Sequence, residues 1–516
     1  MSRIRASKDK QGSRGALLRR LGASVEEHRL DNGMRVIIGE RHLDPVVAAM
    51  VFYRVGARNE REDEAGVSHF LEHMMFKGSR GYAKGEVDLV TTKLGGSNNA
   101  YTSWDHTAYW FQLASDRWKK ALEIEADRMA NLLLDPAEFA AEKEVVLEEL
   151  SMGLDDPWRV LSDAVQTALF PRHPYRRPII GYPDTLRLMT PDVMRDYYRR
   201  FYHPGNATLV LCGDVDPTEA LAAAREHFGA IPAGPAYEAV DPWRGPTGEL
   251  TQETRLGVRW DDPANRLCIA WPTVRVGTDE DYALDVLTTV LTGGRLSRLH
   301  RRLVLVEGLA TSISTSNDTR VEGGSFWLFA ECAGDVEPAA LEAAVDQEFS
   351  RVRDELVSAK ELAVAKAMLD ASDAYEHETV SDLAEDLGEY AVDATWQLLL
   401  ENSERTQRVT AKQVRDVARK YLVPGRSVVG WCTPNEEQTA KKAARKPGKP
   451  KPGTPKERVP KKTAARKTAS KTATAKKAGK RTAKKTAARK KVTRKSPPTG
   501  RAKKKVAKKS KRRSRA

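Results

Sequence analysis

The sequence repeats itself at a distance of 220 residues, and this repeat limits the possible folds more than any other feature. "TPDVMRDYYRRFYHPGNATLVLC" (190–212) aligns without a gap with "TAKQVRDVARKYLVPGRSVVGWC" (410–432), and seven of the 23 positions are identical. Each copy has the pattern of a helix, a Pro-Gly turn and a buried strand. Because 516 residues are also too many for one compact core, we predict two related domains.

Strand and helix patterns mix without strict alternation in the first copy. Strands are predicted at 30–38, 45–56, 98–103 and 106–113, and helices at 65–77, 84–94, 115–133 and 136–152. This arrangement favours an α+β fold over a series of parallel βαβ units. We expect two homologous α/β-sandwich domains, each with an antiparallel-rich sheet covered by helices.

The predicted domain boundaries follow the composition. A linker is expected near 231–250, where proline and glycine are frequent. The chain then divides into a basic disordered N-terminus (1–22), a first domain (23–236), a homologous second domain (237–435) and a basic tail (436–516).

Charge is distributed very unevenly along the chain. Residues 441–516 hold 34 Lys and Arg against one acidic residue, Glu457, whereas the preceding 440 residues carry a net charge of −18. The tail has too few apolar side chains to offset the entropy of ordering, so we expect it to be disordered. A polycation of this kind binds polyanions through counterion release. The candidate partners are nucleic acid, the acidic body of this same protein, and acidic substrates.

The cysteines and the apolar runs indicate the compartment. Cys212, Cys268, Cys332 and Cys432 lie far apart with no CxxC pair, which argues against a disulfide scaffold and a cysteine metal site. Residues 1–23 are basic but lack the apolar core of a signal peptide, and no run approaches the roughly 20 apolar residues that span a membrane. We therefore expect a cytoplasmic protein with no membrane partner.

The stretch "HFLEH" (69–73) places two histidines four residues apart. On a helix, His69 and His73 share one face and direct their rings at one point, with Glu72 close to that face. A catalytic zinc site uses three protein ligands and leaves one position for water. A third ligand is therefore needed from another part of the chain.

The predicted helix over 137–152 offers candidates for this third ligand, namely Glu142, Glu144, Glu148 and Glu149. Glu142 and Glu149 are two turns apart on one face. The apolar stripe expected to dock the helix consists of Val145, Val146 and Leu150. We select Glu149 as the ligand, with Glu142 behind it.

A second interpretation is that both helices are ordinary amphipathic elements. A histidine pair at this spacing is common by chance, and an acidic helix is usually a solvated face. The surrounding sequence, "AGVSHFLEHMMFKG", favours the metal site, because an imidazole in an apolar environment is costly unless it is ligated or paired.

Several segments extend the metal motif, and they occur in a consistent order. HxxEH is the inverted zincin motif. The further segments are "LGGSNNAYTSWDHTAYW" (94–110), "EKEVVLEEL" (142–150), "HPYRRPIIGY" (173–182) and "FYHPGNATLVLCGDV" (201–215). With these, the chain from about residue 25 to 435 resembles the pitrilysin/insulinase family of zinc peptidases, in particular the processing-peptidase-like branch with two homologous domains per chain.

The resemblance implies a Zn²⁺ cofactor and a role for each residue of the motif. His69, His73 and Glu149 would be the zinc ligands, Glu72 the general base, and Glu142 a supporting carboxylate of the catalytic centre. In this mechanism Glu72 takes a proton from zinc-bound water, which attacks a peptide carbonyl, and later returns the proton to the leaving amine.

The resemblance also implies where the substrate lies. In the family, the GGxxNAxT segment is a sheet edge to which an extended peptide adds as a further strand, so Asn99, Ala100 and Tyr101 would bind the substrate main chain. The alternative is that this segment is a purely structural edge strand.

The segment "LVLVEGLAT" (303–311) departs from the family pattern, in which an arginine and a tyrosine seven residues apart hold the substrate. Val304 and Thr311 stand at these two positions. As in the mitochondrial processing peptidase, this departure implies a heterodimer whose homologous partner lacks HxxEH and supplies the missing pair. A homodimer that uses Arg301 or Arg302 is the alternative.

The leading hypothesis is a zinc metalloendopeptidase that cleaves peptides or unfolded segments as the catalytic subunit of a heterodimer. The alternative is a non-catalytic homologous scaffold whose basic tail binds nucleic acid. The intact set of His69, Glu72, His73 and Glu149 favours the enzyme, since a scaffold has no physical need of convergent imidazoles and a base.

Overall fold

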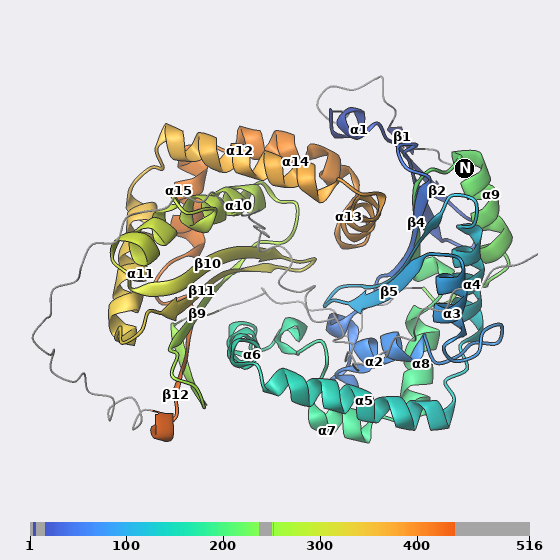
Figure 1. The fold of residues 1–516 in the computed structure, drawn as a ribbon, viewed down its shortest axis with the longest axis horizontal. Helices are drawn as coiled ribbons and strands as arrows, with labels where there is room; N and C mark the ends of the chain where they lie inside the picture. The colour runs from blue at the N-terminus through green and yellow to red at the C-terminus, as the bar shows by residue number, and fades with distance from the viewer. Residues whose placement is uncertain (1–3, 7–15, 237–249, 251, 439–516) are drawn as a thin grey trace, which may run out of the picture. The chain divides into compact units, whose positions relative to one another are not determined.

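The computed structural model describes residues 4–6, 16–236, 250 and 252–438. Within this part of the chain, helices accompany two separate β-sheets (Figure 1), which confirms the predicted α+β class. The tail from residue 439 onward and most of the predicted linker lie outside the described residues.

The first sheet contains seven strands, β1 (Ile4–Ala6), β2 (Ser24–Arg29), β3 (Arg35–Glu40), β4 (Val46–Tyr53), β5 (Ser97–Thr102), β6 (Thr107–Ala114) and β7 (Ala207–Gly213). Their order across the sheet is β1-β2-β3-β7-β4-β6-β5. Strands β3 and β7 are parallel, and the other neighbouring pairs of this sheet are antiparallel. Strand β5 therefore forms one edge of the sheet.

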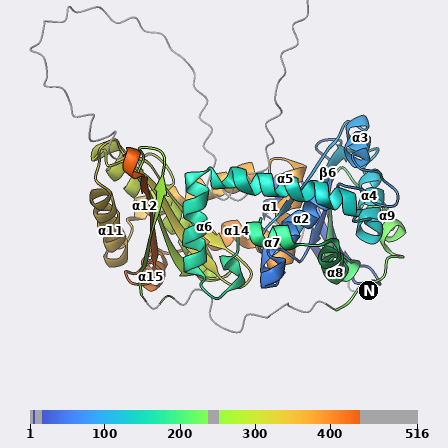
Figure 2. The same ribbon diagram turned by 90° about the horizontal axis from the view of Figure 1, so that it is seen from below.

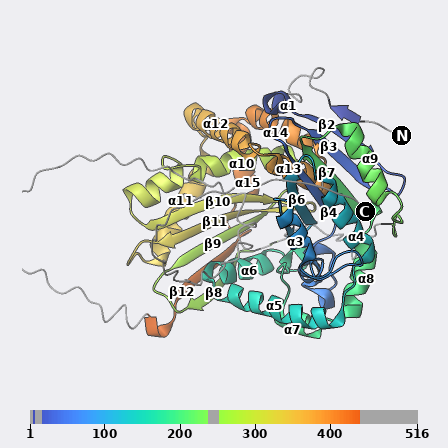
Figure 3. The same ribbon diagram turned by 45° about the vertical axis from the view of Figure 1, so that its right-hand side comes forward.

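The second sheet contains five strands, β8 (Thr254–Trp260), β9 (Arg266–Thr273), β10 (Ala310–Thr319), β11 (Gly324–Cys332) and β12 (Val428–Pro434). Their order is β10-β11-β9-β12-β8, and Figure 3 shows β10, β11 and β9 side by side. The parallel pair β12 and β8 corresponds to β7 and β3, so the second sheet repeats the order of the first. Strand β10 occupies the edge position that β5 occupies in the first sheet.

The helices of the first half are α1 (Ala16–Leu21), α2 (Val67–Met74), α3 (Glu86–Lys93), α4 (Lys119–Asn131), α5 (Pro136–Leu154), α6 (Pro157–Leu169), α7 (Pro183–Leu188), α8 (Pro191–Phe201) and α9 (Pro217–Phe228). The second half has α10 (Asp279–Thr292), a π-helix η6 (His300–Val306), α11 (Pro338–Asp354), α12 (Ala359–Glu376), α13 (Val380–Asp393), α14 (Gln397–Arg408) and α15 (Ala411–Tyr421). None of the helices in the described residues is both long and apolar enough to cross a membrane.

The internal repeat is confirmed at the level of single elements. Helices α8 and α15 start 220 residues apart, and each is followed by an interior strand of its sheet, β7 or β12. The helix that follows β4 is α2, with its two histidines, whereas the helix that follows β9 is α10, with the sequence DEDYALDVLTTVLT. The duplicated fold therefore carries the histidine pair in one half.

The central strand β4 is apolar on both faces, because both faces of the first sheet are covered. Val51 belongs to a core shared with α2, α4, α5 and α8. Phe52, on the opposite face, packs with Leu383 and Leu387 of α13. A helix from the second half of the chain thus covers the first sheet.

The predicted disorder of residues 1–22 is wrong for the part that the structure describes. Strand β1 pairs with β2, and α1 buries three leucines at helical spacing, Leu17, Leu18 and Leu21. These leucines join the core on the α13 side of the first sheet. The prediction rested on the basic composition of the segment, whereas the burial of these leucines stabilises the helix.

Candidate metal centre

The helix α2 carries the HxxEH motif and starts after a glycine in a left-handed conformation. Gly66 has a φ of 96°, and a Cβ atom at this position would lie 2.6 Å from the carbonyl oxygen of Ile180. The buried Glu60 carboxylate accepts hydrogen bonds of 2.9 Å from the amides of Gly66 and Ser68. It thereby satisfies N–H groups that a helix start leaves unpaired. These contacts fix the start and direction of α2.

The helix α5 approaches α2 from a separate part of the chain, and the two lie side by side (Figure 2). Its start is defined by Asp135, whose side chain accepts a hydrogen bond of 2.8 Å from the amide of Ala137. Val146 and Leu150 are buried as predicted, whereas Val145 is 46% exposed and does not belong to the docking stripe. Phe139 and Glu142 join Val146 and Leu150 on the buried face instead.

The two helices bring the three predicted ligands together. Nε2 of His69 lies 3.8 Å from Oε1 of Glu149, and Nε2 of His73 lies 3.4 Å from its Oε2. Each residue has a ligand atom within 4.8 Å of one on the other two. This is the one metal-capable group of histidine, cysteine and acidic side chains found in the described residues.

Glu142 and Lys77 support the second histidine. Nδ1 of His73 lies 2.9 Å from Oε1 of Glu142, and Nζ of Lys77 lies 2.5 Å from the other carboxylate oxygen. The first contact orients the imidazole so that its Nε2 faces Glu149. Glu142 thus contacts a ligand from behind, as predicted, while Lys77 was not predicted from the sequence.

The two imidazoles have opposite pKa shifts. Burial, reinforced by the neighbouring His73, lowers the pKa of His69 to about 4, so this ring is neutral near pH 7. Burial also acts to lower the pKa of His73, but the hydrogen bonds to Glu142 and Glu149 outweigh it and raise that pKa to about 9. A hydrogen bond from His73 lowers the pKa of Glu149, which is therefore an anion at neutral pH.

This donor set fits zinc. Two imidazole nitrogens and one carboxylate oxygen are a common protein ligand set of a catalytic zinc ion. The buried Nδ1 of His69 has no hydrogen-bond partner, and within the described residues no fourth ligand joins the group. Such a three-ligand centre leaves a coordination position for water or substrate.

Glu72 lies beside the centre with its carboxylate held by the sheet. Oγ1 of Thr102, the last residue of β5, donates a hydrogen bond of 2.6 Å to Oε2 of Glu72. Burial raises the pKa of Glu72 to about 7, although this hydrogen bond acts to lower it. A carboxyl group that titrates near neutrality is suited to accept and to release a proton.

The predicted substrate-binding segment is the edge strand β5. Asn99 is exposed, Ala100 is buried in the core on the α2 side, and the hydroxyl of Tyr101 donates a 2.8 Å hydrogen bond to Glu389 of α13. The expectation of a sheet edge beside the motif is therefore confirmed. Thr102 belongs to the quoted "NAYT" pattern, but only the structure shows that its hydroxyl reaches Glu72.

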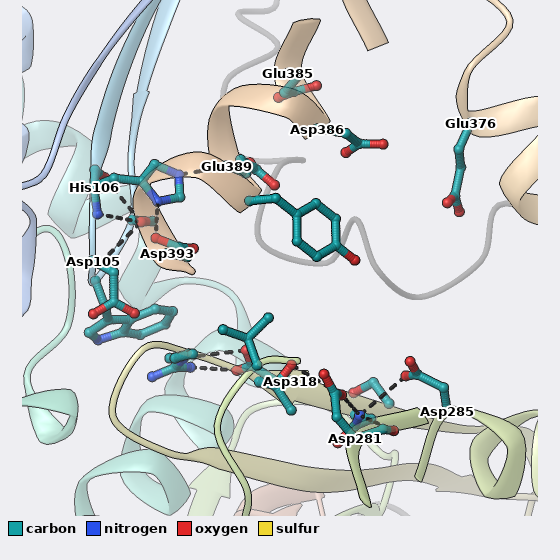
Figure 4. A pocket seen from close by; sticks show the side chains of 18 of the residues that line it. Asp105, His106, Asp281, Asp285, Asp318, Glu376, Glu385, Asp386, Glu389 and Asp393 are labelled. Atoms are coloured by element: carbon teal, nitrogen blue, oxygen red, sulfur yellow. Dashed lines mark hydrogen bonds and ion pairs between the residues drawn. The ribbon is translucent and has the colours of Figure 1, made fainter. Parts of the chain in front are cut away.

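A cavity of about 490 Å³ extends from the end of β5 to α13 and β10. Tyr101 and Thr102 form part of its lining, so it opens close to the base Glu72. Most of its labelled side chains are carboxylates, among them Asp281, Asp318 and Glu385 (Figure 4). The space next to the candidate centre is therefore strongly acidic.

The segment over 303–311 does not supply a substitute for the missing arginine. Val304 lies in η6 and packs against the apolar core of the second half. The hydroxyl of Thr311 donates a hydrogen bond to Glu331. The guanidinium of Arg302 is held by Glu307 and Gln347.

A duplicated α/β fold whose HxxEH helix meets a distant glutamate defines the inverted class of zinc-peptidase site. Residues 35–182 match the family described as Insulinase (Peptidase family M16), and residues 189–369 match the domain described as Peptidase M16 inactive domain. The matches cover more than half of the chain, which therefore belongs to the insulinase family, peptidase family M16.

Relatives of known sequence carry names that agree with this family. An uncharacterized zinc protease of Mycobacterium bovis is 30% identical over 396 residues, which cover 76% of this chain and 90% of that protein. The zinc protease PqqE of Helicobacter pylori is 26% identical over 440 residues, covering 82% and 98% respectively. These relatives support a peptidase role for the chain.

Solved structures show the same fold. A protease from Helicobacter pylori has a TM-score of 0.76 at 24% identity and covers 80% of this chain and 100% of its own. A peptidase M16 inactive domain from Pseudomonas fluorescens has a TM-score of 0.72 at 19% identity, covering 80% and 98%.

Proposed function

We propose that this chain is a zinc-dependent endopeptidase that cleaves peptides or unfolded segments. The observation that supports this most strongly is the meeting of His69, His73 and Glu149 at one point, with the carboxylate of Glu72 alongside. The second half, whose corresponding helix α10 has no histidine, would act as a non-metal domain that lines the acidic cavity.

The chain's own residues supply binding and proton transfer. His69, His73 and Glu149 would hold Zn²⁺, which when bound would supply Lewis acidity for a peptide carbonyl and for water. Glu72 takes a proton from the attacking water and returns it to the leaving amine. The main chain of β5 aligns an extended peptide through Asn99, Ala100 and Tyr101, so recognition tolerates many side chains.

One preparation assayed for both zinc content and peptide hydrolysis tests this function. In the variant Glu72→Gln, we expect zinc content to stay the same and turnover to fall by a factor of about 10² to 10⁴, which is the usual contribution of a general base. Glu148→Gln, an exposed neighbour of the ligand on α5, serves as the matched control and should keep full activity. Turnover that survives Glu72→Gln would show that Glu72 is not the base.

We also propose a homologous partner subunit. The proposal rests on Val304 and Thr311, neither of which offers the side chain needed to hold substrate, and on the engagement of Arg302 with Glu307. The isolated chain should bind zinc but cleave peptides poorly, and a homologous subunit without HxxEH should raise the rate. Full activity of the isolated chain would favour a homodimer that uses Arg301.

The basic tail supports a second activity, binding of nucleic acid, in a cytoplasmic protein. Its support is compositional, with 34 Lys and Arg against one acidic residue from Lys441 onward. The four cysteines are free and buried, which suits a reducing compartment. Retention of DNA by the full chain but not by one that ends at Pro434, at low salt only, is the expected result. Equal retention of both chains would contradict it.

A further inference from the structure

The last residue of the edge strand β5 is the feature from which we draw a further inference, which rests on the proposed peptidase function. Thr102 is the one hydrogen-bond partner that the described residues give to the Glu72 carboxylate, at 2.6 Å. The Glu72 side chain is partly buried where α2 meets the end of β5. We propose that Thr102 is a positioning residue, which sets the orientation of the base relative to the substrate.

The alternation of side chains along β5 supports this role. Ala100 belongs to the core on the α2 side of the sheet, and Tyr101 reaches Glu389 on the α13 side. Thr102, two residues after Ala100, therefore points to the α2 side again, where Glu72 lies. The strand is thus fixed on one face by a tyrosine and delivers a hydroxyl to the base on the other.

Two consequences follow if one strand both anchors the base, through Thr102, and aligns the substrate. A peptide that adds to the free edge of β5 takes its position from the same backbone that holds the Thr102 hydroxyl. The Glu72 oxygen and the peptide carbonyl therefore both take their positions from β5. A glutamate has three rotatable bonds, and without this hydroxyl its carboxylate loses its anchor.

A substitution series separates this role from a general effect on the strand. Thr102→Val keeps the branched shape that suits a strand but removes the hydroxyl, whereas Thr102→Ser keeps the hydroxyl. For Thr102→Val we expect kcat to fall by roughly 10- to 100-fold, with KM, zinc content and thermal midpoint close to those of the natural protein. Thr102→Ser should restore most of kcat.

Crystal structures provide a readout that does not depend on turnover. The Glu72 carboxylate should keep its position in Thr102→Ser and leave it in Thr102→Val. If the isolated chain is inactive, these two structures test the proposal in place of kcat. Unchanged kcat or an unmoved carboxylate in Thr102→Val would overturn the proposal while leaving the peptidase function intact. Failure of the peptidase function itself appears separately, as a natural protein that neither binds zinc nor hydrolyses peptides, with or without a homologous subunit.

Discussion

His69 and His73 lie one helical turn apart, yet their surroundings differ at the scale of single residues. His73 is supported by Glu142, which is itself paired with Lys77, whereas the buried Nδ1 of His69 has no hydrogen-bond partner. Helical periodicity was enough to predict that the two histidines share one face and to select Glu149. Lys77 did not, because a contact between α2 and α5 depends on how the two helices pack.

The support of His73 leads to a prediction about metal affinity. Glu142→Gln keeps the volume of the side chain but removes the charge that orients the imidazole, so we expect zinc to bind roughly 10- to 100-fold more weakly. Competition with a chromophoric chelator measures this change. Glu138→Gln on the same helix removes a carboxylate that pairs with Lys84 and is the matched control. Equal losses in both variants would argue against a specific role of Glu142.

At the scale of elements, α13 shows where sequence periodicity reaches its limit. Leu383, Leu387 and Ala391 recur at intervals of four and predict an amphipathic helix. The pattern does not say which apolar surface this stripe covers, and the structure places it on the sheet of the other half. Elements with strong local signals, such as α2 to α5, β5 and β6, are predictable, whereas this long-range pairing is not.

The start of α2 leads to a second prediction. Gly66→Ala introduces a left-handed alanine and a contact with the Ile180 carbonyl, so it should lower the free energy of unfolding by roughly 2 to 4 kcal/mol. Gly85, at the start of α3, has a φ of 74°, but a methyl group added there would have no atom within 4 Å. Gly85→Ala should therefore cost only about 1 kcal/mol. Urea unfolding measures the loss of stability in both variants. Equal losses would show that the contact with Ile180 does not contribute.

The turn between β5 and β6 makes stability depend on pH. Burial acts to lower the pKa of His106, but Asp393 and Glu389 of α13 outweigh it and raise the pKa to about 10. Since the folded pKa exceeds the unfolded value of 6.5, this stabilisation is complete below pH 6.5 and disappears as the pH rises towards 10. His106→Gln should therefore cost roughly 3 kcal/mol more at pH 6.5 than at pH 9.5, as measured by urea unfolding. A cost independent of pH would contradict a charged His106.

At the scale of the whole molecule, duplication and charge were both readable from the sequence. The repeat at 220 residues predicted two related halves, and α8 and α15 confirm it. The net charge of −18 before Lys441 predicted an acidic body. It did not predict that carboxylates from α13 and β10 gather around one cavity, because those segments are far apart in the sequence.

This acidic cavity leads to a prediction about substrates. Peptides with several Lys or Arg residues should have a KM about 3- to 10-fold lower than neutral analogues at low salt, because the carboxylates attract cations. The advantage should shrink at 0.5 M salt, where charges are screened within about 5 Å. Peptides of the same sequence with acetylated lysines are the control. Equal KM values at low salt would show that the cavity does not select by charge.

The packing of α13 against the first sheet affects how the two halves dissociate after cleavage. Because α13 shields Phe52 and its neighbours from water, the covalent linker is not what keeps the halves together. A protease nick between residues 237 and 249 should yield two fragments that co-elute as a complementing pair. Each fragment expressed separately should aggregate, because it would expose the apolar surface that the other half covers.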